Sequence, residues 1–217
     1  MRQVRDHCVR CGECCLRSSP TLHREDLHLV KRGLIGKRHL YTLRRGEAVR
    51  DNVKGGVAVI RKEMIKVREK PGGACILYDA EAGACTIYDQ RPLQCAALKC
   101  WDTRDFMKVY EGPRLERSAV VEDETLMGFI EGHERRCAYR ALERHVRRIP
   151  TEGEKAVEEV IRILRFDYHF RPAVAEKLGI EAQDMDFFFG RPLVDTISMF
   201  GIKVIRQPGG SFFLTRV

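Results

Sequence analysis

Apolar residues recur at intervals of three and four along the second half of the chain, and this period indicates helices. One helix is predicted over 122–148, where a single stripe holds Leu126, Ile130, His133, Cys137, Ala141 and His145. Thr151-Glu152-Gly153-Glu154 has the sequence of a capping box and is expected to begin the next helix, with Val157, Val160, Ile161 and Leu164 facing inward. Shorter helices are predicted over 172–178 and 192–200, because a glycine follows each of them.

Short apolar runs of strand length mark other regions. Strands are predicted over 57–60, 64–67, 202–206 and 211–215. The last two are expected to form a hairpin around Pro208-Gly209-Gly210. Near the N-terminus, a short helix is predicted with Thr21 as its cap and Gly33 as its stop.

An internal repeat lies between these regions. Gly73-Ala74-Cys75-Ile76-Leu77-Tyr78-Asp79 is echoed ten residues later by Gly83-Ala84-Cys85-Thr86-Ile87-Tyr88-Asp89. Each copy is expected to form a short strand that begins at its cysteine, and the short linker allows a hairpin that brings both sulfurs together. The alternative is a hairpin with two buried core cysteines. Pro92 is then expected in the first turn of a helix that runs from Cys95 toward Cys100.

These elements predict an α+β fold. A small cysteine-rich metal-binding domain with short strands is expected over residues 1–115, and a mainly helical domain that ends in a β-hairpin over residues 116–217. No run of about 18 apolar residues is present, so no membrane-spanning helix is expected. The first six residues have no apolar stretch behind them and do not resemble a signal peptide, so the protein is expected to be cytoplasmic.

Cysteine placement is the strongest chemical signal. Eight thiols form two groups of four: Cys8, Cys11, Cys14 and Cys15, then Cys75, Cys85, Cys95 and Cys100. A reducing compartment favours metal ligands over disulfides. The first group has the C-x2-C-x2-C spacing of a loop that holds three corners of an iron–sulfur cubane, while C-x2-C alone also serves zinc sites. All eight are therefore candidate metal ligands, for an iron–sulfur cluster first and for zinc as the alternative; a metal-free redox pair is a third option.

Two pairs of potential metal-ligating side chains lie close together in sequence. Adjacent side chains diverge in extended backbone, so Cys14 and Cys15 are not expected to bind one ion. Either Cys15 serves a second centre, or a multi-metal cluster accepts both, or one of the two is a packing residue. Elsewhere, His133 and Cys137 lie four residues apart on one helical face and are expected to pack in the core.

The net charge of +8 is unevenly spread. Residues 1–70 contain 18 Lys+Arg and 8 Asp+Glu, whereas residues 71–217 contain 21 and 23. The basic excess could bind nucleic acid or an acidic partner, or it could offset the charge of a thiolate centre. The second interpretation is favoured, since residues 1–70 show no aromatic platform that would stack bases. The C-terminal helices and hairpin resemble a winged helix, but residues 150–217 hold 9 Lys+Arg against 10 Asp+Glu, which disfavours nucleic acid.

At its cysteines the chain resembles the CxxCxxCC family, also called YkgJ-type cysteine cluster proteins, whose domains are described as zinc- or iron-chelating. The matching residues are Cys8-x2-Cys11-Gly12-x-Cys14-Cys15, then Cys75, then Cys85-Thr86-Ile87-Tyr88-x2-Arg91-Pro92-x2-Cys95. The family pattern continues with a basic residue and an aromatic, where this chain has Ala96-Ala97-Leu98-Lys99-Cys100, so the role of Cys100 stays open. The resemblance covers about residues 5–100 and implies nothing for residues 116–217.

The leading interpretation is a metal-cluster-binding protein of unknown reaction, and whether it is an enzyme stays open. Flagellin lysine-N-methylases look like a branch of this family and contain an iron–sulfur cluster. A cluster-dependent protein lysine methyltransferase is therefore one alternative, although the chain has no Gly-rich nucleotide loop. A zinc-stabilised adaptor or a nucleic-acid-associated protein is the other. No membrane association is expected, and the sequence does not identify a protein partner or substrate.

Overall fold

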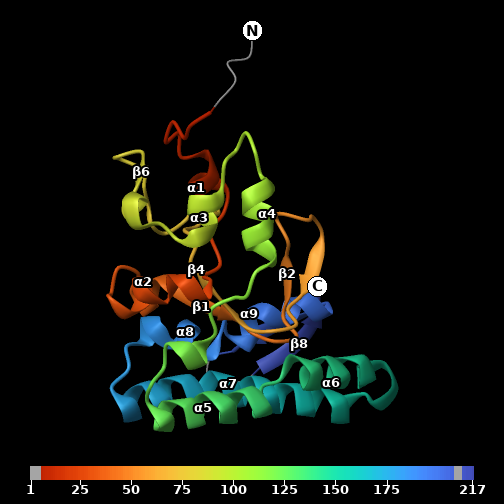
Figure 1. Cartoon of the computed structure of the whole chain (residues 1–217). Helices are drawn as coiled ribbons and strands as arrows, with labels where there is room; N and C mark the ends of the chain where they lie inside the picture. Colours follow the sequence, from red (N-terminus) through yellow and green to blue (C-terminus); the bar gives the residue numbers. More distant parts are fainter. Residues whose placement is uncertain (1–5, 208–211) are drawn as a thin grey trace. The chain divides into compact units, whose positions relative to one another are not determined.

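The computed structural model describes residues 6–207 and 212–217 (Figure 1). About 50% of the chain is helical and 17% is strand, with short antiparallel strands in the first part, helices in the middle and a hairpin at the end. The fold is therefore α+β, as the sequence predicts. The chain forms two compact units, Met1–Tyr41 with Met64–Val120 and Thr42–Glu63 with Val121–Val217. The sequence pattern places its division at residue 115 and gives no sign that Thr42–Glu63 belongs with the later residues.

Short elements make up the first unit. Its helices and helical turns are α1 (Glu13–Arg17), η1 (Arg24–Asp26), α2 (Leu27–Lys31), η2 (Lys37–His39), η3 (Tyr88–Gln90), α3 (Leu93–Ala97), α4 (Arg104–Glu111) and η4 (Arg117–Ala119). Its strands are the beginning of β1 (Leu40–Leu43), then β4 (Met64–Val67), β5 (Tyr78–Asp79) and β6 (Ala84–Cys85). The predicted strand over 64–67 is thus confirmed.

Backbone hydrogen bonds tie the beginning of this unit to its end. The N–H of Leu22 donates to the Ile65 carbonyl (2.8 Å), and the N–H of Leu115 donates to the Leu22 carbonyl (2.9 Å). All three side chains are fully buried. Three distant parts of the sequence therefore form one small core, and the cysteine groups lie in the segments that flank it in sequence.

The predicted helix from Thr21 to Gly33 begins later than expected. Thr21 forms a strand-like bridge with Lys66, and helical turns begin only at Arg24. Pairing with a distant segment has overridden the capping tendency of the threonine. At the other end the prediction is confirmed: α2 ends before Gly33, which has a left-handed backbone (φ 72°) and donates its N–H to the Val30 carbonyl (3.0 Å).

The internal repeat forms a hairpin, but with a different register from the predicted one. Strands β5 and β6 pair Tyr78 with Cys85 and Asp79 with Ala84. The first strand therefore uses the end of its repeat and the second uses the beginning. Cys75 lies outside the hairpin, where its backbone bridges Glu69. The short turn between the strands sets this register, because only residues close to the turn can pair across it.

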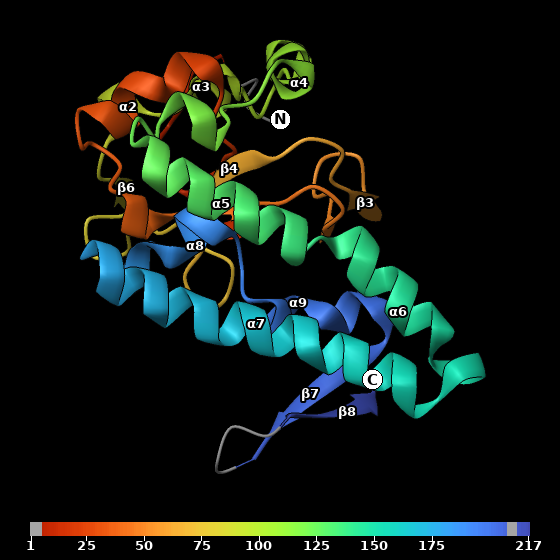
Figure 2. The same ribbon diagram turned by 90° about the horizontal axis from the view of Figure 1, so that it is seen from below.

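Long helices dominate the second unit, and Figure 2 shows α7 running back along α6. Its elements are the end of β1, β2 (Ala48–Arg50), β3 (Val57–Val59), α5 (Glu124–Arg136), α6 (Tyr139–Glu152), α7 (Glu154–Leu178), η5 (Ala182–Asp184), α8 (Met185–Phe189), α9 (Leu193–Thr196), η6 (Ile197–Phe200), β7 (Ile202–Arg206) and β8 (Phe212–Arg216). Strands β2 and β3 pair antiparallel, as do β7 and β8. The predicted strand over 57–60 and the C-terminal hairpin are present, while the predicted turn residues 208–210 and Ser211 lie outside the described residues.

The helix predicted over 122–148 is in fact two helices. Cys137 leaves the helical conformation at the end of α5 (φ −109°, ψ 23°), and α6 begins at Tyr139. The predicted capping box is also wrong, because Thr151 lies in the last turn of α6 and donates its hydroxyl to the Arg148 carbonyl (3.1 Å). The helix ends instead at Gly153 (φ 57°), a conformation that glycine adopts without strain.

A separate helix over 172–178 does not form. Helix α7 continues through Pro172 to Leu178 over 25 residues, and Gly179 ends it with a left-handed backbone (φ 61°), as predicted. Buried residues before and after the proline, from Ala156 to Val174, anchor one face of the helix. This packing outweighs the hydrogen bond that proline cannot donate.

One hydrophobic cluster forms the core of the second unit. Its buried members are Cys137, Tyr139, Leu142, Val160, Ile163, Leu164, Leu193, Ile197, Ile202 and Phe212. The predicted core position of Cys137 is therefore confirmed, and the same holds for His133, which is fully buried. Within the described residues, no helix combines the length and apolar character that crossing a membrane requires.

Candidate metal centre

The adjacent thiols Cys14 and Cys15 lie on helix α1 and not in extended backbone. Gly12 caps this helix with a left-handed backbone (φ 75°), and the Leu16 N–H donates to its carbonyl (2.9 Å). On the helix the two sulfur atoms lie 3.9 Å apart, close enough for a weak S–H···S hydrogen bond. The expectation that these side chains diverge is therefore wrong, because it depends on an extended chain.

Gly12 also packs against the second cysteine segment. A Cβ atom at this position would lie 2.6 Å from the hydroxyl oxygen of Tyr78 and 2.9 Å from its Cζ atom. Tyr78 in turn pairs with Cys85 across the β5–β6 hairpin. The absence of a side chain at Gly12 thus allows α1 to approach the hairpin closely.

The two cysteine groups meet through their backbones. The N–H of Cys75 donates to the carbonyl of Cys15 (2.7 Å), although the two residues are far apart in sequence. Cys75 is buried, while Cys15 and Cys85 are half-buried. Helix α1, the turn at Cys75 and the β5–β6 hairpin therefore converge on one place in the first unit.

Two buried polar side chains hold α3, the helix that contains Cys95. Asp26 accepts the N–H of Leu93, at the first turn of α3, through Oδ1 (2.8 Å). Gln94 accepts the N–H of Thr21 through Oε1 (2.9 Å). Burial raises the pKa of Asp26. The hydrogen bonds that its carboxylate accepts from the N–H groups of His23 and Leu93 oppose this rise. The start of α3 is thereby fixed to the segment 21–26, which sets the position of Cys95.

Thiols from both groups affect one another's ionisation. The hydrogen bond with Cys15 lowers the pKa of Cys14 to about 6, and the same contact together with burial raises the pKa of Cys15. The charges of Cys95 and Cys85 raise the pKa of Cys15 further. Burial raises the pKa of Cys95, and nearby Cys75, Cys14 and Cys85 add to the effect. Because the charges of neighbouring thiols raise the pKa of Cys15 and Cys95, a cation bound among these thiols would be favoured.

Cationic and hydroxyl groups surround Cys8. A hydrogen bond with Tyr88 lowers the pKa of Cys8, and the Arg10 N–H and the charge of Arg91 lower it further. The guanidinium carbons of Arg10 and Arg91 lie 4.0 and 4.1 Å from the centroid of the Tyr88 ring. Positive charge therefore lies beside the thiols, which is the arrangement that charge compensation predicts.

Cys11 and Cys100 are exposed thiols, and among the described residues no contact joins either sulfur to another cysteine. No three of the eight sulfurs lie within 4.8 Å of one another. Four sulfurs placed 2.3 Å from a single zinc ion would lie about 3.8 Å apart. The thiol donors suit zinc or iron. The Cys14–Cys15 separation of 3.9 Å matches the spacing around one tetrahedral ion, and no third sulfur of the eight lies within 4.8 Å of both.

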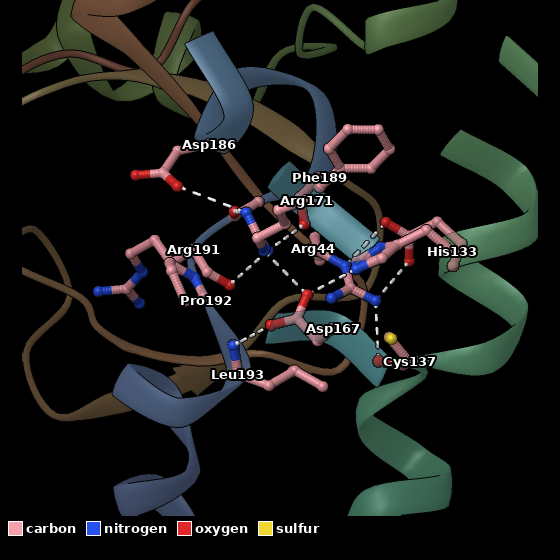
Figure 3. A network of polar contacts seen from close by, with 12 residues as sticks. Arg44, His133, Cys137, Asp167, Arg171, Asp186, Phe189, Arg191, Pro192 and Leu193 are labelled. Carbon is pink, nitrogen blue, oxygen red and sulfur yellow. Dashed lines mark hydrogen bonds and ion pairs between the residues drawn. The ribbon is translucent and has the colours of Figure 1, made fainter. Parts of the chain in front are cut away.

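A second cluster of potential ligands lies in the second unit (Figure 3). Ligand atoms of His133, Cys137 and Asp167 lie within 4.8 Å of one another, and all three side chains are buried. Asp167 Oδ1 accepts from His133 Nε2 (2.7 Å) and Arg171 Nε (2.9 Å), and Oδ2 accepts the Leu193 N–H (2.8 Å). The carboxylate is thus already saturated by donors and neutralised by a guanidinium group. This cluster is a polar network that links helices, which agrees with the predicted core role of His133 and Cys137.

Acid is expected to weaken the second unit through His133. Burial lowers the pKa of this imidazole from 6.5 to about 4, against the opposing effect of its hydrogen bond to Asp167. The unfolded chain therefore takes up a proton at higher pH than the folded one. The contribution of His133 to the free energy of unfolding should be constant above pH 6.5 and fall by at most about 1.4 kcal/mol per pH unit as the pH falls from 6.5 toward 4.

Denaturant titrations of the full-length chain at about pH 7.5 and about pH 5 measure this effect. A His133→Gln variant cannot take up the proton, so its stability should change less between the two conditions. Equal changes in the two proteins would contradict the prediction.

Sequence reasoning finds the thiols but not every residue that holds them. The motif includes Gly12 and Tyr88, whose packing roles only the structure reveals. Asp26 and Arg10 belong to no recognisable pattern, because a carboxylate before a distant helix and an arginine in a loop are common without such a role.

The comparisons with known proteins agree with this geometry. Residues 7–113 match the model of the CxxCxxCC family, described as "Putative zinc- or iron-chelating domain". The comparison with curated proteins found no match, and neither did the comparison with solved structures. The match to the CxxCxxCC family therefore covers the segment that contains all eight clustered thiols.

Proposed function

We propose that the first unit binds a metal centre through its thiolates, and that this centre is an iron–sulfur cluster in preference to zinc. The proposed ligands are drawn from Cys8, Cys11, Cys14, Cys15, Cys75, Cys85, Cys95 and Cys100. When bound, such a centre would supply redox or Lewis-acid chemistry.

One observation supports the proposal above the others: two cysteine groups far apart in sequence converge. The hydrogen bond between the Cys75 N–H and the Cys15 carbonyl fixes the two segments to each other. A core built only for stability does not require several thiols at one place, since each is easily replaced by an apolar residue. Convergence of soft donors is what a bound metal requires.

The spacing of the sulfurs supports a cluster over a single ion. The pair Cys14 and Cys15, at 3.9 Å, could both reach one metal, but no third sulfur of the eight joins them within 4.8 Å. A multi-metal cluster spreads its thiolate ligands over a wider cage than a tetrahedral zinc ion does.

Anaerobic purification of the full-length chain, followed by metal analysis and an ultraviolet–visible spectrum, tests the proposal. Stoichiometric iron with sulfide and a brown colour with absorbance near about 400 nm are expected, because thiolate-to-iron charge transfer colours such clusters. Stoichiometric zinc in a colourless protein would support chelation but overturn the iron–sulfur assignment.

A pair of variants identifies the site. Cys95→Ser is expected to lose metal and also stability, because ligand binding contributes folding free energy. Cys137→Ala, a buried cysteine outside the group, should keep its metal. A wild-type protein that folds and melts normally without any metal would overturn the whole proposal.

A further inference from the structure

The turn between Cys8 and Cys11 has a strained backbone. Within residues 6–207 and 212–217, Arg10 is the residue other than glycine that has a positive φ (55°). An L side chain in this conformation costs free energy, and the conformation persists only where surrounding contacts enforce it. Some neighbouring group must hold the turn in this shape.

Backbone contacts do not hold it. Helix α1 is attached to the second cysteine segment through the Cys15 carbonyl, which accepts the Cys75 N–H. Among the backbone hydrogen bonds of the described residues, none joins residues 8–11 to that segment. The attachment of this turn therefore depends on side chains.

Tyr88 supplies the side-chain contacts. Its ring touches the guanidinium group of Arg10 at 4.0 Å and that of Arg91 at 4.1 Å. Because Tyr88 lies in η3, between Cys85 and Cys95, its ring links Arg10, inside the turn, to the second cysteine group.

We propose that Tyr88 is a positioning residue that clamps the turn of residues 8–11 onto the second cysteine segment, and that this clamp controls how fast the metal centre releases metal. The second part rests on the proposed function. Opening the clamp would relax the backbone of Arg10 and would break the contacts of Tyr88, so the two effects oppose each other. Cys8 and Cys11, both exposed, would be the first ligands to leave.

Metal extraction from the full-length loaded protein tests the clamp. Arg10→Ala keeps a strained residue but removes the guanidinium group from the ring, so extraction by EDTA is expected to become about two to five times faster. Arg17→Ala is the matched control, since Arg17 is also exposed, lies on the same segment and pairs with Glu13 (3.2 Å). Its extraction rate should stay at the wild-type value.

Variants of the ring separate positioning from general damage. Tyr88→Leu should release metal at least as fast as Arg10→Ala, because it also removes the contact with Arg91. Adding Arg10→Ala to Tyr88→Leu should not speed the release further, because the contact that Arg10 makes is already lost. Tyr88→Phe keeps the ring and should retain most of the wild-type behaviour.

Proteolysis provides a readout that needs no metal. In the metal-free full-length chain, Tyr88→Leu should speed trypsin cleavage after Arg10 severalfold, while cleavage after Arg17 serves as the internal reference. Equal extraction rates for Arg10→Ala and Arg17→Ala would overturn control of metal release, and unchanged cleavage after Arg10 would overturn the clamp. If the wild-type protein holds no metal, both the proposed function and the control of metal release by Tyr88 are wrong. The rate of cleavage after Arg10 still tests whether Tyr88 holds the turn in place.

Discussion

Replacing Asp167 with alanine is expected to destabilise the second unit by about 3–5 kcal/mol, the range seen when one partner of a buried ion pair is removed. The carboxylate is fully buried and accepts from His133, Arg171 and the Leu193 N–H. Its loss leaves the Arg171 guanidinium group without its closest charge partner and the start of α9 without an acceptor. Three elements, α5, α7 and α9, lose their common contact at once.

Denaturant unfolding followed by circular dichroism near about 222 nm measures this effect, because helices α5, α6 and α7 dominate that signal. Asp195→Ala is the matched control. Asp195 lies in the same unit, but its side chain is 59% exposed and its ion pair with Arg206 spans 3.5 Å. This control should cost less than about 1 kcal/mol. Similar losses for the two variants would show that the Asp167 network does not support the unit.

Replacing Gly12 with alanine is expected to cost about 2–5 kcal/mol and to reduce metal content as well. The new Cβ atom would meet the hydroxyl oxygen of Tyr78 at 2.6 Å, and the backbone has a left-handed φ of 75°. Steric overlap and backbone strain therefore add together. Relief would require α1 to move away from the β5–β6 hairpin, which would separate Cys14 and Cys15 from Cys85.

Gly33→Ala isolates the strain from the overlap. Gly33 lies in the same unit and has a similar φ of 72°, but a Cβ atom there would meet nothing within 4 Å. It should cost only about 1–2 kcal/mol and leave the metal content unchanged. Thermal melting and metal analysis of both variants measure the difference. Equal effects would mean that the contact between Gly12 and Tyr78 does not position the thiols.

The spacing of apolar residues predicts where helices lie in this chain, but it does not predict where they end. The stripe through Cys137 continues the period of three and four, and only the structure shows that the chain leaves helical geometry there. Pro172 gives the opposite error, because a signal that normally ends a helix is outweighed by packing on both sides of it. Local patterns report preferences of a few tenths to a few kcal/mol per residue, and burial of an entire face exceeds them.

The candidate site also contains residues that the sequence predicts and residues that it does not. Residue type and spacing predict that the thiols act together, because metal binding needs those atoms. The arrangement of Cys14 and Cys15 depends on α1, whose glycine cap follows from contact with Tyr78. The role of Asp26 depends on a hydrogen bond to Leu93, a residue far along the chain. Such roles arise from tertiary contacts and leave no local trace.

The membership of Thr42–Glu63 in the second unit has a consequence for the order in which the protein can fold during synthesis. This segment leaves the ribosome early, but the hydrogen-bond partners of its side chains are synthesised later. Arg44 pairs with Glu134, and Thr42 donates to the carbonyl of Phe187. Until then the Arg44 guanidinium group, fully buried in the finished protein, must stay hydrated. A fragment cut after Val120 would keep that segment permanently without its partners. Excising the cysteine-rich half as an independent module would therefore require removal of Thr42–Glu63 and a short linker in its place.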